Sequence, residues 1–306
     1  METNWIFKKM KVIITGATGF VGANLHNYLK TSYKIETRSV RYQPNQQFEM
    51  NSDVIIHLAG KAHDLKKVST PKEYYEANFE LAKQLFDAFL VSSASVFIFM
   101  STVKAVADAV NGILKENEGP NPKTHYGIAK QQAEAYILSA NVPDGKRVYI
   151  LRPCMIHGPG NKGNLNLLYQ LVGKGLPWPL GGFENQRSFL SVENLCFVIK
   201  ELLQNETVPS GIYNLADDAD LSTNKLIQLL GESLGKPAKI VNLSPTLIRN
   251  IAKIGDVLPL PLNSERLQKL TESYIVSNQK IVQAIGKPLP ISSEDGLRLT
   301  FKSFRK

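Results

Sequence analysis

A tyrosine and a lysine lie four residues apart in the segment THYGIAK (residues 124–130), at Tyr126 and Lys130. In a helix, residues four apart lie one above the other on the same face. An ammonium beside a phenol favours the ionised phenol and so lowers its pKa. The pair could therefore exchange a proton with a substrate near neutral pH, or it could be ordinary helix surface. The spacing alone favours ordinary surface, so the elements around the pair must decide.

Three glycines follow a short apolar, β-branched run at residues 12–15. The segment TGATGFVG places Gly16, Gly19 and Gly22 between this expected strand and an amphipathic helix from about Phe20. Glycine lets a backbone approach a pyrophosphate closely, and a helix N-terminus offers free N–H groups and a favourable dipole. The pattern predicts a dinucleotide-binding turn.

Strand and helix patterns alternate from residue 11 to about 153. Apolar runs such as VIIHL and VFIFM are typical of strands buried on both faces, and residues 71–94 and 124–140 have helical periodicity. The alternation predicts an α/β fold with a Rossmann-type doubly wound parallel sheet. Beyond Pro153 the chain is rich in loop residues, and a helix capped by Ser222 is expected to end at Gly235.

The change from alternating strands and helices to a loop-rich composition beyond Pro153 predicts two domains. We expect a dinucleotide-binding domain of residues 9–160 plus about 188–216. A smaller, discontinuous, mixed α/β C-terminal substrate domain would comprise about 161–187 plus 217–306.

Composition excludes several classes of protein. The longest apolar runs are far too short to span a bilayer, and no signal peptide is visible, so we expect a cytoplasmic protein with no membrane partner. Cys154 and Cys196 form neither a metal spacing nor a disulfide framework. The net charge of +9 is scattered and no nucleic-acid module is present, so no nucleic-acid partner is expected.

The motifs TGATGFVG, HLAG, STVKAV, YGIAK and RPCMIHGPG together make the chain resemble an extended short-chain dehydrogenase/reductase of the NAD-dependent epimerase/dehydratase family. It is similar in particular to bacterial UDP-N-acetylhexosamine 4-ketoreductases and 4-epimerases. The resemblance implies that Tyr126 exchanges a proton with the sugar oxygen. It also implies that Lys130 holds the nicotinamide ribose and lowers the tyrosine pKa, and that Thr102, rather than Ser101, hydrogen-bonds the reacting oxygen. Relatives often form homodimers through a four-helix face.

Open α/β sheets bind ligands at the carboxyl ends of their strands, where Thr102 and the glycine turn are both expected. We expect the cofactor to contact Gly16, Thr18, Gly19, Phe20, Val21, Gly22, Arg38, Arg41, Leu58, Ala59, Gly60, Asn78, Tyr126, Lys130 and Pro153. By resemblance, we expect a UDP-sugar substrate to contact Thr102, Lys104, Tyr126, Asn164 and Arg187.

Departures from relatives narrow the reaction. Nucleotide-sugar 4,6-dehydratases carry an Asp-Glu pair after the catalytic threonine, where this chain has Val103 and Lys104. GDP-fucose synthase-like enzymes use a cysteine and a histidine that are not found at the matching places, and His157 is interpreted as a loop or packing residue. Hydride chemistry at one carbon, C4, remains: reduction of a 4-keto sugar, or 4-epimerisation with tightly bound NAD. The resemblance to enzymes of UDP-N-acetylated hexosamines implies that the ketone is that of a UDP-linked 4-keto-(6-deoxy)-N-acetylhexosamine for surface polysaccharide. A non-catalytic, cofactor-sensing protein is a distant alternative.

The end of the second expected strand bears on the cofactor. NAD enzymes usually have an acid there for the adenosine ribose. Here the segment reads ETRSVRY, so Arg38 and Arg41 flank the place and suit a 2′-phosphate, while Glu36 keeps NAD possible. We therefore expect NADP, which favours the reductase because a reductase consumes and releases NADPH.

Overall fold

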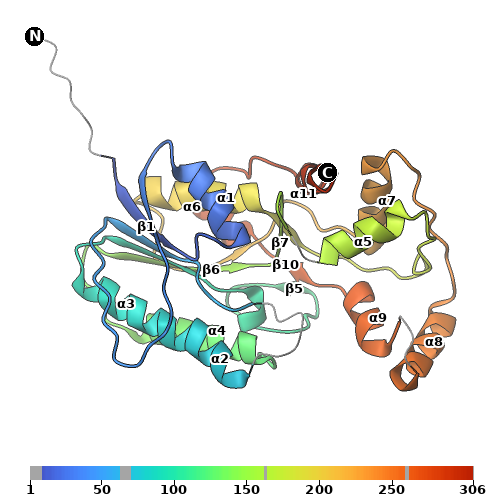
Figure 1. Ribbon diagram of the computed structural model, residues 1–306, viewed down its shortest axis with the longest axis horizontal. Helices are drawn as coiled ribbons and strands as arrows, with labels where there is room; N and C mark the ends of the chain where they lie inside the picture. Colours follow the sequence, from blue (N-terminus) through green and yellow to red (C-terminus); the bar gives the residue numbers. More distant parts are fainter. Residues whose placement is uncertain (1–8, 63–69, 162–163, 259–261, 306) are drawn as a thin grey trace, which may run out of the picture.

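A computed structural model describes residues 9–62, 70–161, 164–258 and 262–305. Its largest sheet has six parallel strands in the order β2-β1-β3-β4-β6-β9. Figure 1 shows this sheet between the helices that cover it. These strands are β1 (Lys11–Thr15), β2 (Lys34–Arg38), β3 (Val54–His57), β4 (Val96–Met100), β6 (Arg147–Pro153) and β9 (Gly211–Leu215). Two short pairs complete the described strands: β5 (Ile113–Leu114) with β10 (Ile275–Val276), and β7 (Met155–His157) with β8 (Phe189–Ser191).

Helices cover both faces of this sheet. One face carries α1 (Phe20–Leu29), α6 (Val192–Gln204) and α10 (Gln279–Ile285), and the other carries α3 (Leu81–Val91) and α4 (His125–Ser139). Neighbouring strand residues point to opposite faces, so Val12 and Ile14 pack with the first set and Ile13 with the second. The predicted Rossmann-type, doubly wound fold is confirmed.

A third apolar core lies beside the sheet, in the part drawn at the right of Figure 1. It is built from α5 (Asn164–Gly173), α7 (Thr223–Ser233), α8 (Pro245–Val257), α9 (Ser264–Thr271) and α11 (Ser293–Ser303). Ser222 caps α7 as predicted, because its side chain accepts a hydrogen bond from the backbone N–H of Lys225 at 3.0 Å. No helix among the described residues is long and apolar enough to cross a membrane.

Two local features differ from the sequence expectations. The long helix expected at residues 71–94 is α2 (Pro71–Tyr75), a π-helical turn (Glu76–Glu80) and α3. π-Helical turns commonly mark functional sites, and this one carries the buried Asn78. Helix α5 was not expected at all, because it follows directly on the Gly- and Asn-rich segment that indicated a loop.

The chain turns back at β1, which lies between β2 and β3. Ligands of doubly wound sheets bind at such a point, beyond the carboxyl ends of the strands. The glycine turn follows β1, Leu58–Gly60 follow β3, Thr102 follows β4 and Pro153 ends β6. The fold therefore brings the expected cofactor and catalytic residues to one edge.

We predict that Gly16→Ala destabilises the chain by about 1–3 kcal/mol more than Gly145→Ala. Both glycines have positive φ, +70° and +80°, so both substitutions carry the same backbone strain. A Cβ at Gly16 would lie 2.7 Å from the backbone N of Ala59, whereas one at Gly145 would meet nothing within 4 Å. Urea unfolding of both variants measures the difference, and equal losses of stability would contradict the crowding argument.

Candidate active site

The glycine turn packs against the end of β3. A Cβ at Gly22 would lie 2.3 Å from the carbonyl oxygen of Gly16, so α1 can begin this close to the turn only with glycine. The Gly19 backbone N–H donates to the same carbonyl at 3.1 Å. Thr18 is exposed and Phe20 and Val21 are half-buried at the start of α1. These close backbone approaches leave a space that fits the pyrophosphate of a dinucleotide. Side chains in place of the glycines would fill that space.

Helix α4 brings Tyr126 to Thr102. Thr124 caps the helix by accepting from the Gly127 N–H at 3.2 Å. A Cβ at Gly127 would lie 2.4 Å from the carbonyl oxygen of Lys104, so this glycine lets α4 approach the segment after β4. The Thr102 side chain hydrogen-bonds Tyr126. The first two of the expected catalytic residues are therefore in contact.

Burial raises the pKa of Tyr126 to about 12, and the hydrogen bond with Thr102 opposes this only in part. The expectation that Lys130 lowers this pKa is wrong for this arrangement, because burial dominates. The Lys130 ammonium instead donates to the carbonyl oxygen of Met100 at 2.8 Å. Tyr126 is therefore a protonated phenol at neutral pH.

Lys130 is buried, with 4% of its surface exposed. Its ammonium lies 4.6 Å from the centre of the Phe99 ring. Burial lowers the pKa of Lys130 to about 7, although the nearby Glu134 carboxylate raises it. A Cβ at Gly60 would lie 3.3 Å from this nitrogen, so the segment after β3 also lies against Lys130.

Asn78 fixes the segment after β3. Its side-chain oxygen accepts from the Lys61 N–H at 3.1 Å, and its side-chain nitrogen donates to the carbonyl oxygens of Lys61 and Tyr74 at 3.1 and 3.0 Å. A Cβ at Gly60 would lie 2.6 Å from the Asn78 side-chain oxygen. Asn78 therefore fixes the backbone of Lys61 and, through it, the position of Gly60 beside the Lys130 ammonium, although its expected contact with a cofactor stays a prediction.

Ser101 and Thr102 point in different directions, as neighbouring residues of an extended segment do. Ser101 donates to the Glu134 carboxylate, which Arg152 also binds through its Nε at 3.0 and 3.1 Å. All three side chains are buried. Ser101 is thus held away from Tyr126, which agrees with the choice of Thr102. Sequence reasoning missed this triad, whose one signal was that Glu134 follows Lys130 by four residues.

His57, the histidine of HLAG, is a second buried polar residue that sequence reasoning did not single out. Its Nδ1 lies 2.8 Å from the Thr15 hydroxyl, and its ring stacks on Phe99 with centroids 5.8 Å apart. Burial and the Lys130 charge lower the pKa of His57 to about 3. The neutral His57 imidazole therefore stacks on the Phe99 ring, and the Lys130 ammonium contacts the same ring.

The second strand ends at Arg38, and Glu36 lies within it, as expected. Arg38 binds the Glu36 carboxylate at 2.5 Å and also donates to the carbonyl oxygen of Glu49. Lys11 binds the same carboxylate at 2.9 Å. Both cations lower the pKa of Glu36. Glu36 is therefore already paired with basic groups, whereas Arg41 lies exposed beyond the strand.

The expected substrate residues Lys104 and Arg187 lie close together. The Lys104 ammonium donates to the carbonyl oxygen of Asp108 at 2.7 Å and lies 4.4 Å from the Tyr274 ring centre. Arg187 forms isolated backbone bridges with Tyr274 and Leu221. Its guanidinium donates to the carbonyl oxygen of Lys269 at 2.5 Å, and Glu272 lies 4.0 Å away. Tyr274 thus contacts both predicted substrate residues.

Asn164 is the first residue of α5, and its side chain lies outside the described part of the chain. His157 is fully buried, with its Nδ1 2.8 Å from the Thr300 hydroxyl, which fits the interpretation as a packing residue.

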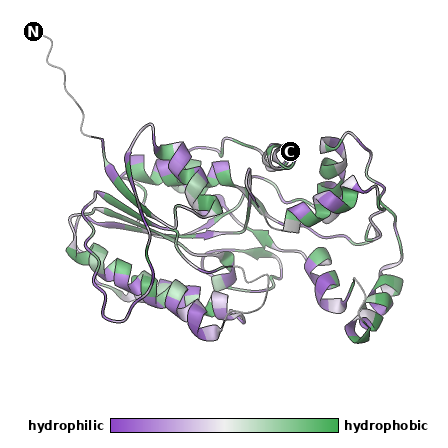
Figure 2. Cartoon of the chain, viewed as in Figure 1, coloured by the Kyte–Doolittle hydropathy of each residue, from purple (hydrophilic) through white to green (hydrophobic). Residues whose placement is uncertain are grey.

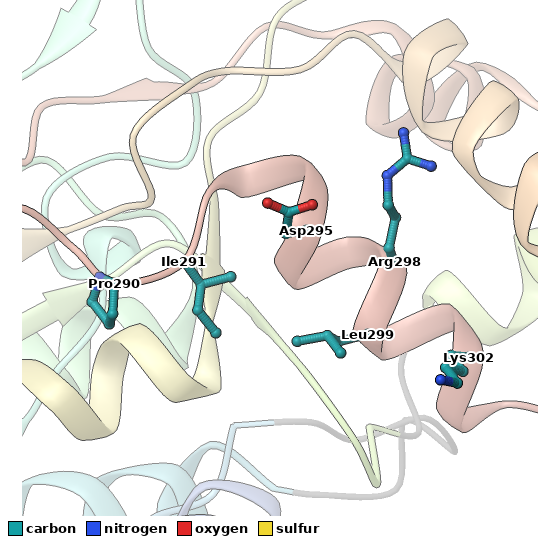
Figure 3. Close-up of a pocket in the computed structure, with 6 residues that line it drawn as sticks. All are labelled: Pro290, Ile291, Asp295, Arg298, Leu299 and Lys302. Carbon is teal, nitrogen blue, oxygen red and sulfur yellow. The ribbon is translucent and has the colours of Figure 1, made fainter.

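A hollow of about 330 Å³ on α11, shown in Figure 3, contains none of the expected site residues. Its Arg298 already pairs with Glu232 and Glu294, so it offers no free anion site.

A sequence model of the NAD dependent epimerase/dehydratase family matches residues 12–216, about two thirds of the chain. The chain belongs to this family. The match runs from the glycine turn through Thr102, Tyr126 and Lys130 to the end of β9, so the geometry described above is that of a family member. The protein is an enzyme of this family.

Curated relatives cover different reactions. The chain is 28% identical over 322 residues to a UDP-glucose 4-epimerase of Vibrio cholerae, covering 96% of this chain and 95% of the relative. It is 29% identical to an N-acetyl-α-D-glucosaminyl-diphospho-ditrans,octacis-undecaprenol 4-epimerase of Escherichia coli O157:H7, over 76% of this chain and 75% of the relative. A GDP-6-deoxy-D-mannose reductase of Pseudomonas aeruginosa is 24% identical over 72% and 79%.

Solved structures share the fold across the whole chain. A UDP-glucuronic acid 4-epimerase of Bacillus cereus in complex with NAD has a TM-score of 0.74 at 18% identity, covering 97% of this chain and 99% of the other. The enzyme RMD of Pseudomonas aeruginosa complexed with NADPH has a TM-score of 0.70 at 20% identity, covering 96% and 99%. The structural neighbours therefore include both NAD and NADPH complexes.

We predict that Lys130→Met abolishes turnover yet stabilises the folded chain at neutral and lower pH. The pKa of Lys130 is about 7 when folded and has an ordinary value of 10.5 when unfolded. Below pH 7 the folded chain bears the full cost of a buried ammonium. That cost falls between pH 7 and 10.5, where the unfolded chain holds more protons. The gain, on the order of 2 kcal/mol, should shrink over the same interval.

Urea unfolding at pH 6, 7.5 and 9 tests this, because each point samples a different part of that interval. Exposed Lys174→Met is the matched control and should change stability by the same small amount at each pH. A Lys130→Met variant that is less stable than wild type at pH 6 would show that the ammonium stabilises the fold.

Proposed function

We propose that the protein is a nucleotide-sugar oxidoreductase that reduces the C4 ketone of a UDP-linked 4-keto-(6-deoxy)-N-acetylhexosamine with NADPH. The observation that carries the proposal is the contact of Thr102 with Tyr126, which places a phenol and a second hydroxyl together at the carboxyl edge of the sheet. A protonated phenol can give its proton to a ketone oxygen, which reduction needs, whereas oxidation of a hydroxyl needs a base. The relatives include both reductases and epimerases of sugar substrates.

The residues divide the chemistry among them. NADPH, when bound, supplies the hydride that adds to C4. Thr102 donates or accepts a hydrogen bond at the ketone oxygen and so aligns it with Tyr126, which transfers its proton to that oxygen as negative charge develops. Lys130 lies one helical turn further on, where by the family resemblance its ammonium would hold the nicotinamide ribose. The glycine turn, Gly60 and Asn78 orient the cofactor against this set.

The segment after Thr102 supports hydride transfer without water elimination. Val103 is buried, and the Lys104 ammonium is held by the carbonyl oxygen of Asp108. Neither residue offers a carboxylate that could move protons at neighbouring sugar carbons. Lys104 and Arg187 instead provide two cations suited to a diphosphate, since guanidinium binds phosphate through two parallel hydrogen bonds.

Epimerisation at C4 with retained NAD is the second candidate. The observation that favours it is the match of 28% identity over 96% of the chain to a UDP-glucose 4-epimerase. Such an enzyme would begin by oxidising the C4 hydroxyl, so Tyr126 would first have to lose its proton. Exposed Arg41, and Glu36 already paired with Arg38 and Lys11, favour NADPH over NAD and so favour the reductase.

We predict that the purified protein oxidises NADPH in the presence of a UDP-4-keto-6-deoxy-N-acetylhexosamine and that Tyr126→Phe lowers kcat at least about 100-fold. Tyr136→Phe is the control on the same helix, because its phenol binds Asp87 at 2.6 Å and lies outside the proposed set. Interconversion of UDP-GlcNAc and UDP-GalNAc without added cofactor, with no reduction of the ketone, would establish the epimerase instead.

Arg41→Ala should raise the KM for NADPH about tenfold and leave the KM for NADH nearly unchanged, because it removes a cation from the place expected for the 2′-phosphate. Arg41 is exposed, so the substitution should leave folding intact, unlike one at Arg38, whose guanidinium also binds Glu36 and Glu49. Initial rates with both cofactors measure the effect. Equal effects on the two cofactors would contradict NADP selectivity at this residue.

A further inference from the structure

Helix α8 presents apolar side chains to solvent. Of thirteen large apolar side chains exposed in the described residues, seven lie between 241 and 258. Four of them form a stripe at Leu247, Ile251, Ile254 and Leu258, exposed by 50, 39, 53 and 53%. The spacing of four and three residues keeps Leu247, Ile251 and Ile254 on one face of α8, and Leu258 follows directly after the helix. Clustered exposure of this kind marks an interaction surface, whereas single exposed apolar residues do not.

The stripe is separate from the face with which α8 packs on the protein. Ile248 and Ala252 are buried and join the third core. Successive helix residues are about 100° apart, so the stripe is centred roughly 110° from these two. The side of the helix opposite these two residues, here called the outward pole, lies between the stripe and Lys253. Val257, which is 85% exposed, lies on this side. Figure 1 places α8 at an outer end of the molecule, and Figure 2 shows the helix as largely hydrophobic with polar bands.

Basic residues flank this pole. Arg249 and Lys253 are exposed on the other side of the helix, and Lys236 and Lys239 are exposed in the segment that leads to it. Residues 236–258 hold these four cations and one acid, Asp256, which gives +3. The Asp256 carboxylate already accepts from the Ser264 backbone N–H and hydroxyl at 2.8 and 2.6 Å. The surface therefore combines an apolar stripe with a net positive rim.

We propose that the α8 stripe is a docking surface for an anionic lipid bilayer. An apolar face with Lys and Arg beside it is the pattern of helices that lie in the membrane interface, where apolar residues enter the acyl boundary and cations meet lipid headgroups. A second copy of the chain fits less well. A two-fold interface brings the same patch of both copies together, so two surfaces of net positive charge would face each other.

The position of α8 gives the docking a consequence. Helix α8 packs on α9, whose Lys269 carbonyl oxygen binds the guanidinium of Arg187. Helices α8 and α9 would thus lie between the bilayer surface and Arg187, the cation proposed to bind a sugar diphosphate. Docking would hold the proposed substrate domain of the enzyme at the membrane through this surface, in contrast to the sequence expectation of no membrane partner.

Co-sedimentation of the full chain with phosphatidylcholine vesicles, with and without phosphatidylglycerol, tests the proposal. We expect binding to the anionic vesicles that weakens with added salt, and a loss of about tenfold or more in the partition coefficient for Ile251→Ser/Ile254→Ser. Lys239→Gln/Lys253→Gln should weaken binding to the anionic vesicles only. Leu176→Ser/Leu299→Ser is the matched control, since these side chains are exposed by 52 and 46% outside the stripe and should leave binding unchanged.

Circular dichroism and urea unfolding of each variant check the fold, and the single variant Val257→Ser removes a side chain that is 85% exposed if the double variant proves unstable. Light scattering reports the oligomeric state.

Wild-type protein that does not bind anionic vesicles, or a stripe variant that binds them as wild type does, would overturn the proposal. A stripe variant that turns a dimer into a monomer, while wild type ignores vesicles, would assign the stripe to a second copy. Turnover of a soluble UDP-sugar should be unaffected by the stripe substitutions, so failure of this proposal and failure of the proposed reaction are distinguishable.

Discussion

The buried ammonium of Lys130 is the constraint on which the catalytic edge depends. Moving an ammonium out of water is costly unless the protein replaces its hydration. The replacements are few: the Met100 carbonyl oxygen, the face of the Phe99 ring and the more distant charge of Glu134. The lowered pKa shows that they compensate only in part. Such residual strain is typical of functional sites, where groups are held ready for a ligand at some cost in stability.

Glu134 explains how the chain tolerates this cation. Tyr126, Lys130 and Glu134 follow one another at intervals of four, so one face of α4 carries a phenol, an ammonium and a carboxylate in order. An extended segment that contains Ser101 and Thr102 crosses this face, and each of these two residues contacts one side chain on it. Ser101 points to Glu134 and Thr102 points to Tyr126, because neighbouring residues of an extended segment point in opposite directions. Arg152 then neutralises Glu134, so the buried charges of the edge form a connected set rather than isolated ions.

Much of this edge could be predicted from sequence because its determinants are local. The glycine spacing, the buried strands and the interval of four each depend on a short stretch of chain. The π-helical turn at Asn78 could not be predicted, since its residues have ordinary helical periodicity and Asn78 binds Lys61, which is distant in the sequence. The pKa of Tyr126 was also misjudged, because spacing shows that a lysine is near but not that its ammonium points to Met100. Arg38 was correctly placed at the strand end, yet its pairing with Glu36 depends on side-chain directions across the sheet edge.

The proposed substrate cations pose a different problem, because their surroundings come from distant parts of the chain. Lys104 rests on Tyr274, and Tyr274 donates to the Ala107 carbonyl oxygen at 2.7 Å, so one residue ties the segment after β4 to the C-terminal part. The partners of Lys104 and Arg187 are carbonyl oxygens and a carboxylate. A diphosphate offers the same kind of acceptor with more charge, so it could take over these hydrogen bonds without leaving either cation unpaired. Arg187 bridges Tyr274 through its backbone, so a single residue from the C-terminal part of the chain contacts both proposed substrate cations.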